Sequence, residues 1–214
     1  NPDLSGDARL AIEWSVAYKS SEGLMKGRLG QGSGTSPSLV GTGDQDKFLI
    51  IGDGQELMHM VLIWRNDIPD DWIGLPRRDR RIAAEVPVTF GEEGAEKSTT
   101  EQSLTVRGYG IAAVSNLYGS IPKFRPRLAK RIFGNDTFRT IYRSNYESVA
   151  PYGVEKFVWD PETRKLESVW ANSKISMPNG IPTMSEATGL YYCIGHRDTD
   201  WTLEALDWET GISV

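Results

Sequence analysis

Residues 154–163 read Val-Glu-Lys-Phe-Val-Trp-Asp-Pro-Glu-Thr, and residues 203–211 read Leu-Glu-Ala-Leu-Asp-Trp-Glu-Thr-Gly. Both stretches are rich in alternating apolar residues and both close on a charged turn with Asp, Glu and Thr. Residues 59–67, His-Met-Val-Leu-Ile-Trp-Arg-Asn-Asp, form a third copy of this kind. Such runs are typical of a strand that leads into a hairpin. The chain therefore repeats one strand-and-turn unit.

A pair of short strands is predicted before each copy of this unit. Residues 35–52 and 181–195 each hold a strand that starts near Pro or Ser, then a turn, then a mostly apolar strand, and residues 102–116 give a weaker version. A fourth strand is predicted at 82–89 and again at 166–170. Each repeat is therefore a four-stranded antiparallel meander, and meanders that recur every ~40–50 residues are typical of β-propeller blades.

Counting strands predicts an all-β chain that holds only part of a propeller. We expect residues 9–18 to form an outermost strand, followed by two full blades and three strands of another. About three blades are fewer than the roughly four to eight that close a ring. The rest of the ring would come from another chain, from missing sequence or from a second copy. A sandwich, a barrel or a self-contained closed disc would contradict this interpretation.

Residues 1–214 are expected to form one domain with an insertion at about 116–150. This interval lacks the paired-strand pattern and accounts for the long spacing between Trp64 and Trp159. It contains two helix-like stretches, at 126–133 before Gly134 and after the candidate cap Asp136. The predicted fold is therefore a partial propeller with a partly helical insertion.

The phrase Ala-Leu-Asp-Trp-Glu-Thr-Gly at 205–211 resembles the strand-and-turn signature of quinoprotein-like β-propellers. Residues 159–163 together with Trp170 resemble it more loosely. In quinone-dependent members the resemblance implies pyrroloquinoline quinone (PQQ) over a tryptophan floor, calcium held by Glu, Asn and Asp, and often a vicinal disulfide. Cys193 is the single cysteine, so no vicinal disulfide can form. We therefore expect no PQQ, and calcium stays open as a cofactor.

Bulk properties exclude some classes of protein. The chain has 214 residues, a net charge of −5 and no apolar run near the roughly 20 residues of a transmembrane helix. We expect a soluble protein without a membrane span, and a periplasmic or secreted location stays open. The net negative charge argues against nucleic acid as a partner. Cys193 lies in an apolar run and is expected to be a buried small residue rather than a nucleophile.

The insertion is more basic than the rest of the chain and also carries aromatic residues. Basic residues interleaved with aromatics can bind an anionic partner. The alternative is a solvated cap whose aromatic residues pack on the propeller. The candidate anion-binding residues are Lys123, Arg125, Arg127, Lys130 and Arg131.

Established catalytic motifs are absent from the sequence. It has no phosphate loop, no His-Glu-x-x-His zinc pair and no Gly-x-Ser-x-Gly elbow. His59 and His196, the two histidines, are candidates for proton transfer together with Glu186. Asp53, Asn116 and Glu186 are candidate metal ligands because turns at the mouth of a propeller can converge on its axis. The alternatives are structural histidines and Asx turns.

Two functions therefore remain open after the sequence has been considered. The first is a propeller that acts as a binding or scaffold protein for a small-molecule or protein ligand. The second is a metal-assisted propeller enzyme, either a calcium-dependent hydrolase or lactonase or a quinoprotein-like oxidoreductase. The sequence does not decide whether the protein is an enzyme.

Overall fold

The computed structural model describes residues 13–22, 31–41, 47–119, 147–177, 180–198 and 200–214. Within these ranges the protein is all-β, and its sheets are antiparallel. The single helical element among the described residues is one turn of 3-10 helix, η1 (Glu147–Val149). Nothing helical in these ranges has the length and apolar character needed to cross a membrane.

The first sheet is a meander in which each strand pairs with the next along the chain. Its strands are predicted by their apolar runs, and the structure confirms them at 48–52, 59–64 and 82–87. The order is β1 (Ser38–Val40), β2 (Phe48–Gly52), β3 (His59–Trp64) and β4 (Ile82–Pro87).

The second group of strands repeats this order, and the third group repeats it in part. The second comprises β5 (Thr105–Arg107), β6 (Gly110–Val114), β7 (Tyr152–Asp160) and β8 (Lys165–Ser176). The third comprises β9 (Thr183–Ser185), β10 (Leu190–Arg197) and β11 (Asp200–Asp207). The described strands thus follow one another as two groups of four and one group of three. We call these groups the first, second and third meanders.

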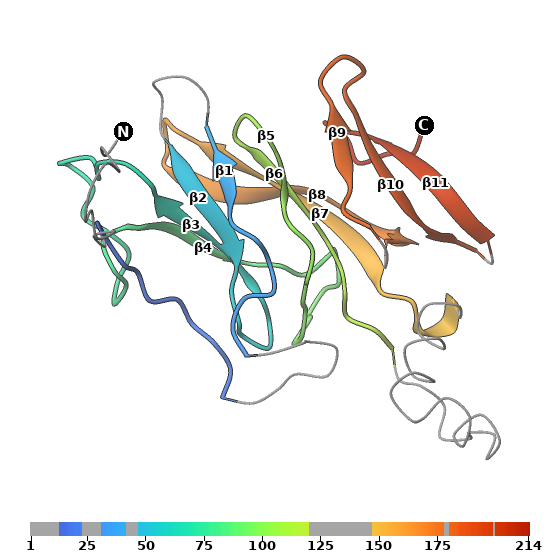
Figure 1. Ribbon diagram of the computed structural model, residues 1–214, viewed down its shortest axis with the longest axis horizontal. Coiled ribbons are helices and arrows are strands. Elements are labelled where there is room, and N and C mark those ends of the chain that lie inside the picture. The colour runs from blue at the N-terminus through green and yellow to red at the C-terminus, as the bar shows by residue number, and fades with distance from the viewer. Residues whose placement is uncertain (1–12, 23–30, 42–46, 120–146, 178–179, 199) are drawn as a thin grey trace, which may run out of the picture.

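The second and third meanders join into one seven-stranded sheet. The junction is a single register pair, His196 of β10 with Ser176 of β8. The sheet curls so far that β5 comes into contact with β9, which makes it nearly closed and barrel-like. Figure 1 shows the three meanders following one another across the molecule in chain order.

Hydrophobic cores fill the spaces between successive meanders. We call the face of each meander that points to the next one along the chain its front face, and the opposite face its rear face. The core between the first and second meanders contains Phe48, Trp64 and Trp159, with ring centroids of the two tryptophans 6.1 Å apart. The core between the second and third contains Tyr191, Leu206 and other apolar residues. The tryptophans of the repeat thus pack between meanders.

The two Asp-x-Glu-Thr turns, at 160–163 and 207–210, make matching hydrogen bonds. Asp160 accepts the N–H of Glu162 and the hydroxyl of Thr163, each at 2.8 Å. Asp207 accepts the corresponding N–H at 3.1 Å and the corresponding Thr hydroxyl at 2.8 Å. Each turn then closes on a residue with positive φ, Arg164 at 51° or Gly211 at 70°. Both turns therefore share an Asp acceptor and a residue with positive φ four positions later.

The prediction of an outermost strand at 9–18 is wrong for residues 13–18, which are the part of this range that the structure describes. Residues 13–19 pair with no strand, and the segment has one isolated bridge, from Ser20 to Gly54. Trp14 and Val16 instead pack on the rear face of the first meander against Ile51, Val61 and Ile63. The segment covers a sheet face because its apolar side chains find more area there than at a sheet edge.

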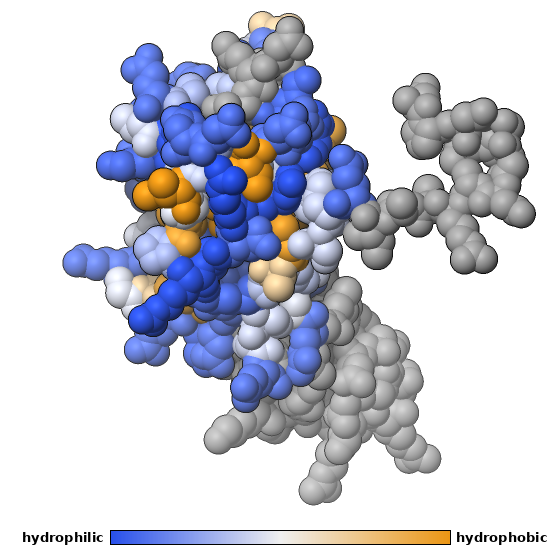
Figure 2. Space-filling view, turned by 90° about the vertical axis from the view of Figure 1, so that its left-hand side faces the viewer, coloured by the Kyte–Doolittle hydropathy of each residue, from blue (hydrophilic) through white to orange (hydrophobic). Residues whose placement is uncertain are grey.

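Figure 2 views the side of the molecule formed by the first meander and this segment, and hydrophobic residues appear there as patches separated by hydrophilic ones.

The predicted insertion lies mostly outside the described residues. Its helix-like stretches at 126–133 and after Asp136 fall in the range 120–146, which the structure does not describe.

Candidate functional site

Polar side chains gather on the rear face of the first meander, where β2 turns into β3. Asp53 directly follows β2, and His59 opens β3. Glu85 of β4 lies opposite Val61 in the register, so it shares the face of His59, two residues away. Asp53, His59 and Glu85 offer ligand atoms that all lie within 4.8 Å of one another.

Asp53 holds the β2–β3 turn in place. It is 1% exposed. Its Oδ1 accepts the backbone N–H of Gln55 at 3.1 Å and that of His59 at 2.9 Å. These contacts form an Asx turn, in which a carboxylate replaces a main-chain acceptor. Asp53 therefore has a structural role whatever else it binds.

The side-chain amide of Gln55 occupies the space between the three ligand atoms. Its Nε2 lies 2.5 Å from Oδ2 of Asp53, 2.9 Å from Nδ1 of His59 and 3.5 Å from Oε1 of Glu85. An amide nitrogen carries two hydrogens, so three acceptors compete for two donors. The amide thus stands where a cation bound by these three atoms would stand.

His59 can change its role with its protonation state. Its Nδ1 lies 3.4 Å from Oδ2 of Asp53, and the hydrogen bond to Asp53 raises the pKa of His59 above 6.5 against the opposing effect of burial. A protonated ring donates from Nδ1 to Asp53, whereas a neutral ring with its proton on Nε2 accepts at Nδ1 from Gln55. Protonation of His59 therefore requires the Gln55 amide to turn.

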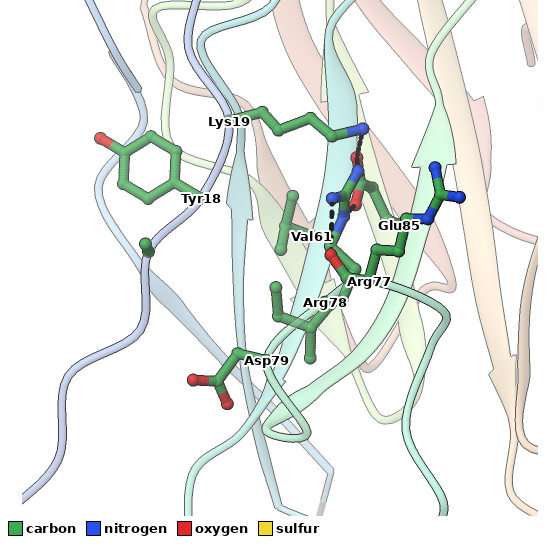
Figure 3. Close-up of a pocket in the computed structure, with 9 residues that line it drawn as sticks. Tyr18, Lys19, Val61, Arg77, Arg78, Asp79 and Glu85 are labelled. Carbon is green, nitrogen blue, oxygen red and sulfur yellow. Dashed lines mark hydrogen bonds and ion pairs between the residues drawn. The ribbon is translucent and has the colours of Figure 1, made fainter.

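Glu85 is already paired with two cations. Arg78 from the β3–β4 loop donates to both of its oxygens, and Nζ of Lys19 from the N-terminal segment lies 2.9 Å from Oε1. Figure 3 shows both cations converging on this carboxylate. Glu85 thus faces two positive charges. The arrangement ties the N-terminal segment and the loop to β4.

A pocket of about 310 Å³ lies beside this ion pair, between the N-terminal segment and strands β3 and β4. Arg78 and Glu85 form one wall, and Tyr18 and Asp79 lie on the far side (Figure 3). The lining carries charges of both signs and no cysteine, serine or histidine. The pocket can therefore hold a small polar group, and the candidate histidines do not line it.

The residues do not fit calcium, the metal that the family resemblance implies. Calcium takes six to eight oxygen ligands, and this site offers two carboxylates, of which Glu85 is bound to Arg78 and Lys19. A divalent ion here would meet both of these cations.

The structure does not bring the three predicted metal ligands together. Oδ1 of Asn116 accepts the hydroxyl of Thr100 at 3.2 Å and the N–H of Glu101 at 2.8 Å. Glu186, in the β9–β10 turn, is exposed and lies 3.3 Å from Nε of Arg107. Successive turns of a meander lie at opposite ends, so Glu186 lies at the other end of the strands from Asp53.

The two histidines and the basic residues are also separate. His196 is 3% exposed and packs against Trp201, with ring centroids 3.6 Å apart and the rings tilted by 40°. It belongs to the third meander, whereas His59 lies on the rear face of the first. The candidate anion-binding residues Lys123, Arg125, Arg127, Lys130 and Arg131 lie outside the described residues.

Sequence reasoning missed the partners that complete the cluster. Glu85 carries the one usable signal, because it is a charge within the otherwise apolar strand Ile-Ala-Ala-Glu-Val. A buried charge in such a strand needs a partner. Lys19, Gln55 and Arg78 have no comparable signal, since each lies in a loop or unpaired segment where charged residues are common.

No family model and no solved structure matches the chain. An uncharacterised protein of Archaeoglobus fulgidus is 51% identical over 205 residues, which are 96% of this chain and 38% of that relative. The chain therefore spans well under half the length of the relative that it matches. The similarity assigns no activity to this chain.

Proposed function

We propose that this chain forms three successive sectors of a quinoprotein-like β-propeller and that it acts as a binding scaffold. The observation that carries the proposal is the arrangement of the three first strands. β1 lies beside β5, and β5 lies beside β9. First strands that follow one another in this way are expected around the axis of a propeller, where the innermost strand of each blade faces the central channel.

A hydrogen bond repeats between these first strands. The hydroxyl of Ser38, the first residue of β1, donates to the carbonyl of Leu104, which precedes β5, at 2.8 Å. The hydroxyl of Thr105, the first residue of β5, donates to the carbonyl of Pro182, which precedes β9, at 3.3 Å. The same step from one meander to the next is thus made twice with the same chemistry. Meanders related by rotation about one axis are expected to repeat the same contact from each meander to the next.

Side chains also join the meanders at their other strands. The carboxylate of Glu155 on β7 accepts the N–H groups of Thr89 and Phe90, which follow β4, at 2.9 and 2.6 Å. Nζ of buried Lys156 donates to the carbonyl of Trp208 at 2.7 Å. These contacts support a rigid stack, which suits a scaffold that holds a ligand at the ends of its strands.

The alternative, a metal-assisted enzyme, would rest on Asp53, His59 and Glu85. Lys19 and Arg78 balance the charge of this cluster, so we give it second place. Calorimetric titration with zinc or calcium checks it. Binding that His59→Ala abolishes would favour the enzyme over the scaffold.

Substitution of the repeated hydroxyls tests the architecture. Ser38→Ala should lower the free energy of unfolding by about 1 kcal/mol, the net value of one hydrogen bond. Thr105→Val should cost somewhat more, because Thr105 also bonds the side chain of Tyr191. Thr183 holds the matching position in β9 and is exposed, so Thr183→Val is the control and should cost nothing in this chain. Equal effects at all three positions would contradict the proposal.

A further inference from the structure

The register places equivalent residues on the front face of each meander. Ile50 pairs with Ser38 and Leu62 in the first meander, and Ala112 pairs with Thr105 and Lys156 in the second. Tyr192 pairs with Thr183 and Ala205 in the third. Two residues further along, the matching pairs are Gly52 with Met60, Val114 with Val154, and Ile194 with Leu203.

Burial at these matched positions differs sharply between meanders. Met60 and Val154 are fully buried, and Val114 is 2% exposed, because each is covered by the next meander. Ile194 is 57% exposed and Leu203 is 75% exposed. Trp201, two residues before Leu203 on the same face, is 46% exposed. The third meander thus exposes an apolar front face at the positions that the other two bury.

The polar contact between meanders is also open at this face. Thr183 is the counterpart of Ser38 and Thr105, whose hydroxyls donate to the next meander. Its hydroxyl is exposed and makes no hydrogen bond to the part of the chain that the structure describes. A main-chain carbonyl that precedes another first strand would complete the pattern.

A second copy of this chain does not offer the matching surface. The surface that fits a front face is the rear face of a meander, and on the first meander Trp14 and Val16 cover that face. The covering segment is fixed by Lys19 on Glu85 and by Gly54, whose N–H donates to the Lys19 carbonyl at 3.0 Å. A copy would have to lose these contacts before it could dock.

We propose that the front face of the third meander is the docking surface for a further antiparallel β-meander of a longer polypeptide. The archaeal relative has room for such a meander, since the matched part is 38% of its length. The occupant presents an apolar rear face to Ile194 and Leu203 and a backbone carbonyl to Thr183. This inference rests on the proposed function.

The test compares this chain with the full-length archaeal relative. Hydroxyl-radical footprinting of both unmodified proteins should label Ile194, Leu203 and Trp201 rapidly in this chain, whereas the aligned residues of the relative should be labelled severalfold more slowly. In parallel, Leu203→Asp should leave the melting temperature of this chain within about 1 °C, because the side chain is exposed. Aspartate at the aligned position of the relative should lower it by about 4 °C or more. Ile73→Asp, at a 94% exposed loop residue, is the control for added charge.

Two results would overturn the proposal. One is equal labelling of the aligned residues in both proteins, which would show that no meander covers the face. The other is a dimer of this chain, measured by light scattering, that Leu203→Asp dissociates, since the occupant would then be a second copy. If only the docking proposal fails, Ser38→Ala and Thr105→Val should still lower the free energy of unfolding. If the proposed function fails, these two substitutions should not lower it.

Discussion

At the scale of single residues, His59 links its charge to the hydrogen bonds around it. Because Asp53 raises the pKa of His59, the folded protein binds this proton more tightly than the unfolded chain does. The resulting stabilisation is fully present below the unfolded pKa of about 6.5 and is lost as the pH rises through the folded pKa. The advantage of the natural protein over His59→Gln should therefore shrink from about pH 5 to about pH 8. Urea unfolding across this range measures it, and a constant difference would contradict the assignment.

Glu155 is a second residue whose charge state bears on stability. Burial raises its pKa although Ser168, Phe90 and Thr89 hydrogen-bond to it. An amide oxygen in Glu155→Gln can accept the same two N–H groups, and the amide nitrogen can donate to Ser168. At pH 7 we expect this variant to be as stable as the natural protein or more so, whereas Glu155→Ala should lose about 2 kcal/mol or more. Chemical denaturation measures the free energy of unfolding of both variants. Equal losses of stability would contradict the expectation that the amide replaces the carboxylate as a hydrogen-bond partner.

Cys193 shows how the interior suppresses reactivity. The prediction that it is a buried small residue is confirmed, with 4% exposed, and burial raises the pKa of its thiol to about 12. The thiolate is the reactive form. We therefore expect no reaction with a thiol-specific reagent at neutral pH in the native protein and full reaction in denaturant. Rapid labelling of the native protein would show that the third meander opens.

At the scale of elements, the junction of β8 and β10 depends on a glycine. A Cβ at Gly195 would lie 1.8 Å from the carbonyl oxygen of Ser176, so the two backbones must separate to accept it. We expect Gly195→Ala to lower the free energy of unfolding by about 1–3 kcal/mol or more. Ser173→Thr adds the same methyl group at an exposed position of β8 and should change little. Thermal unfolding compares the two, and equal shifts would mean that β8 and β10 are not held together here.

The sequence predicted strands well wherever both faces of a strand are used. β2 and β3 have apolar runs because both faces of each strand are covered, and in other strands alternation marks the one face that is buried. The N-terminal segment has a similar pattern at Trp14 and Val16, yet it forms no strand. Alternation shows that one face of a segment is buried, but it does not show whether the backbone has a partner.

The polar cluster was predictable only in part for the same reason. Asp53 and His59 lie in a turn whose composition marks it as a candidate site. Their meeting with Glu85 depends on the register of β3 with β4, which shifts at Leu62/Ile63. A register shift leaves no signal in a single sequence, so the partners could not be assigned in advance.

At the scale of the whole molecule, the sequence predicts how many meanders there are but not how they are arranged. The period predicts that each meander packs a face against its neighbour. It does not distinguish a curled seven-stranded sheet from neighbouring blades, because both bury Tyr191 and Leu206 in the same core. The two arrangements differ at the front face of the third meander, where Ile194 and Leu203 are exposed. Neighbouring blades require a further meander on this face, whereas a curled sheet does not.

An experimental structure of the full-length archaeal relative tests this central claim most directly. We expect the strands aligned with β1, β5 and β9 to surround one axis and a further meander to cover the residues aligned with Ile194 and Leu203. A structure in which the seven-stranded sheet closes as a barrel by itself, with those residues facing solvent, would contradict the account.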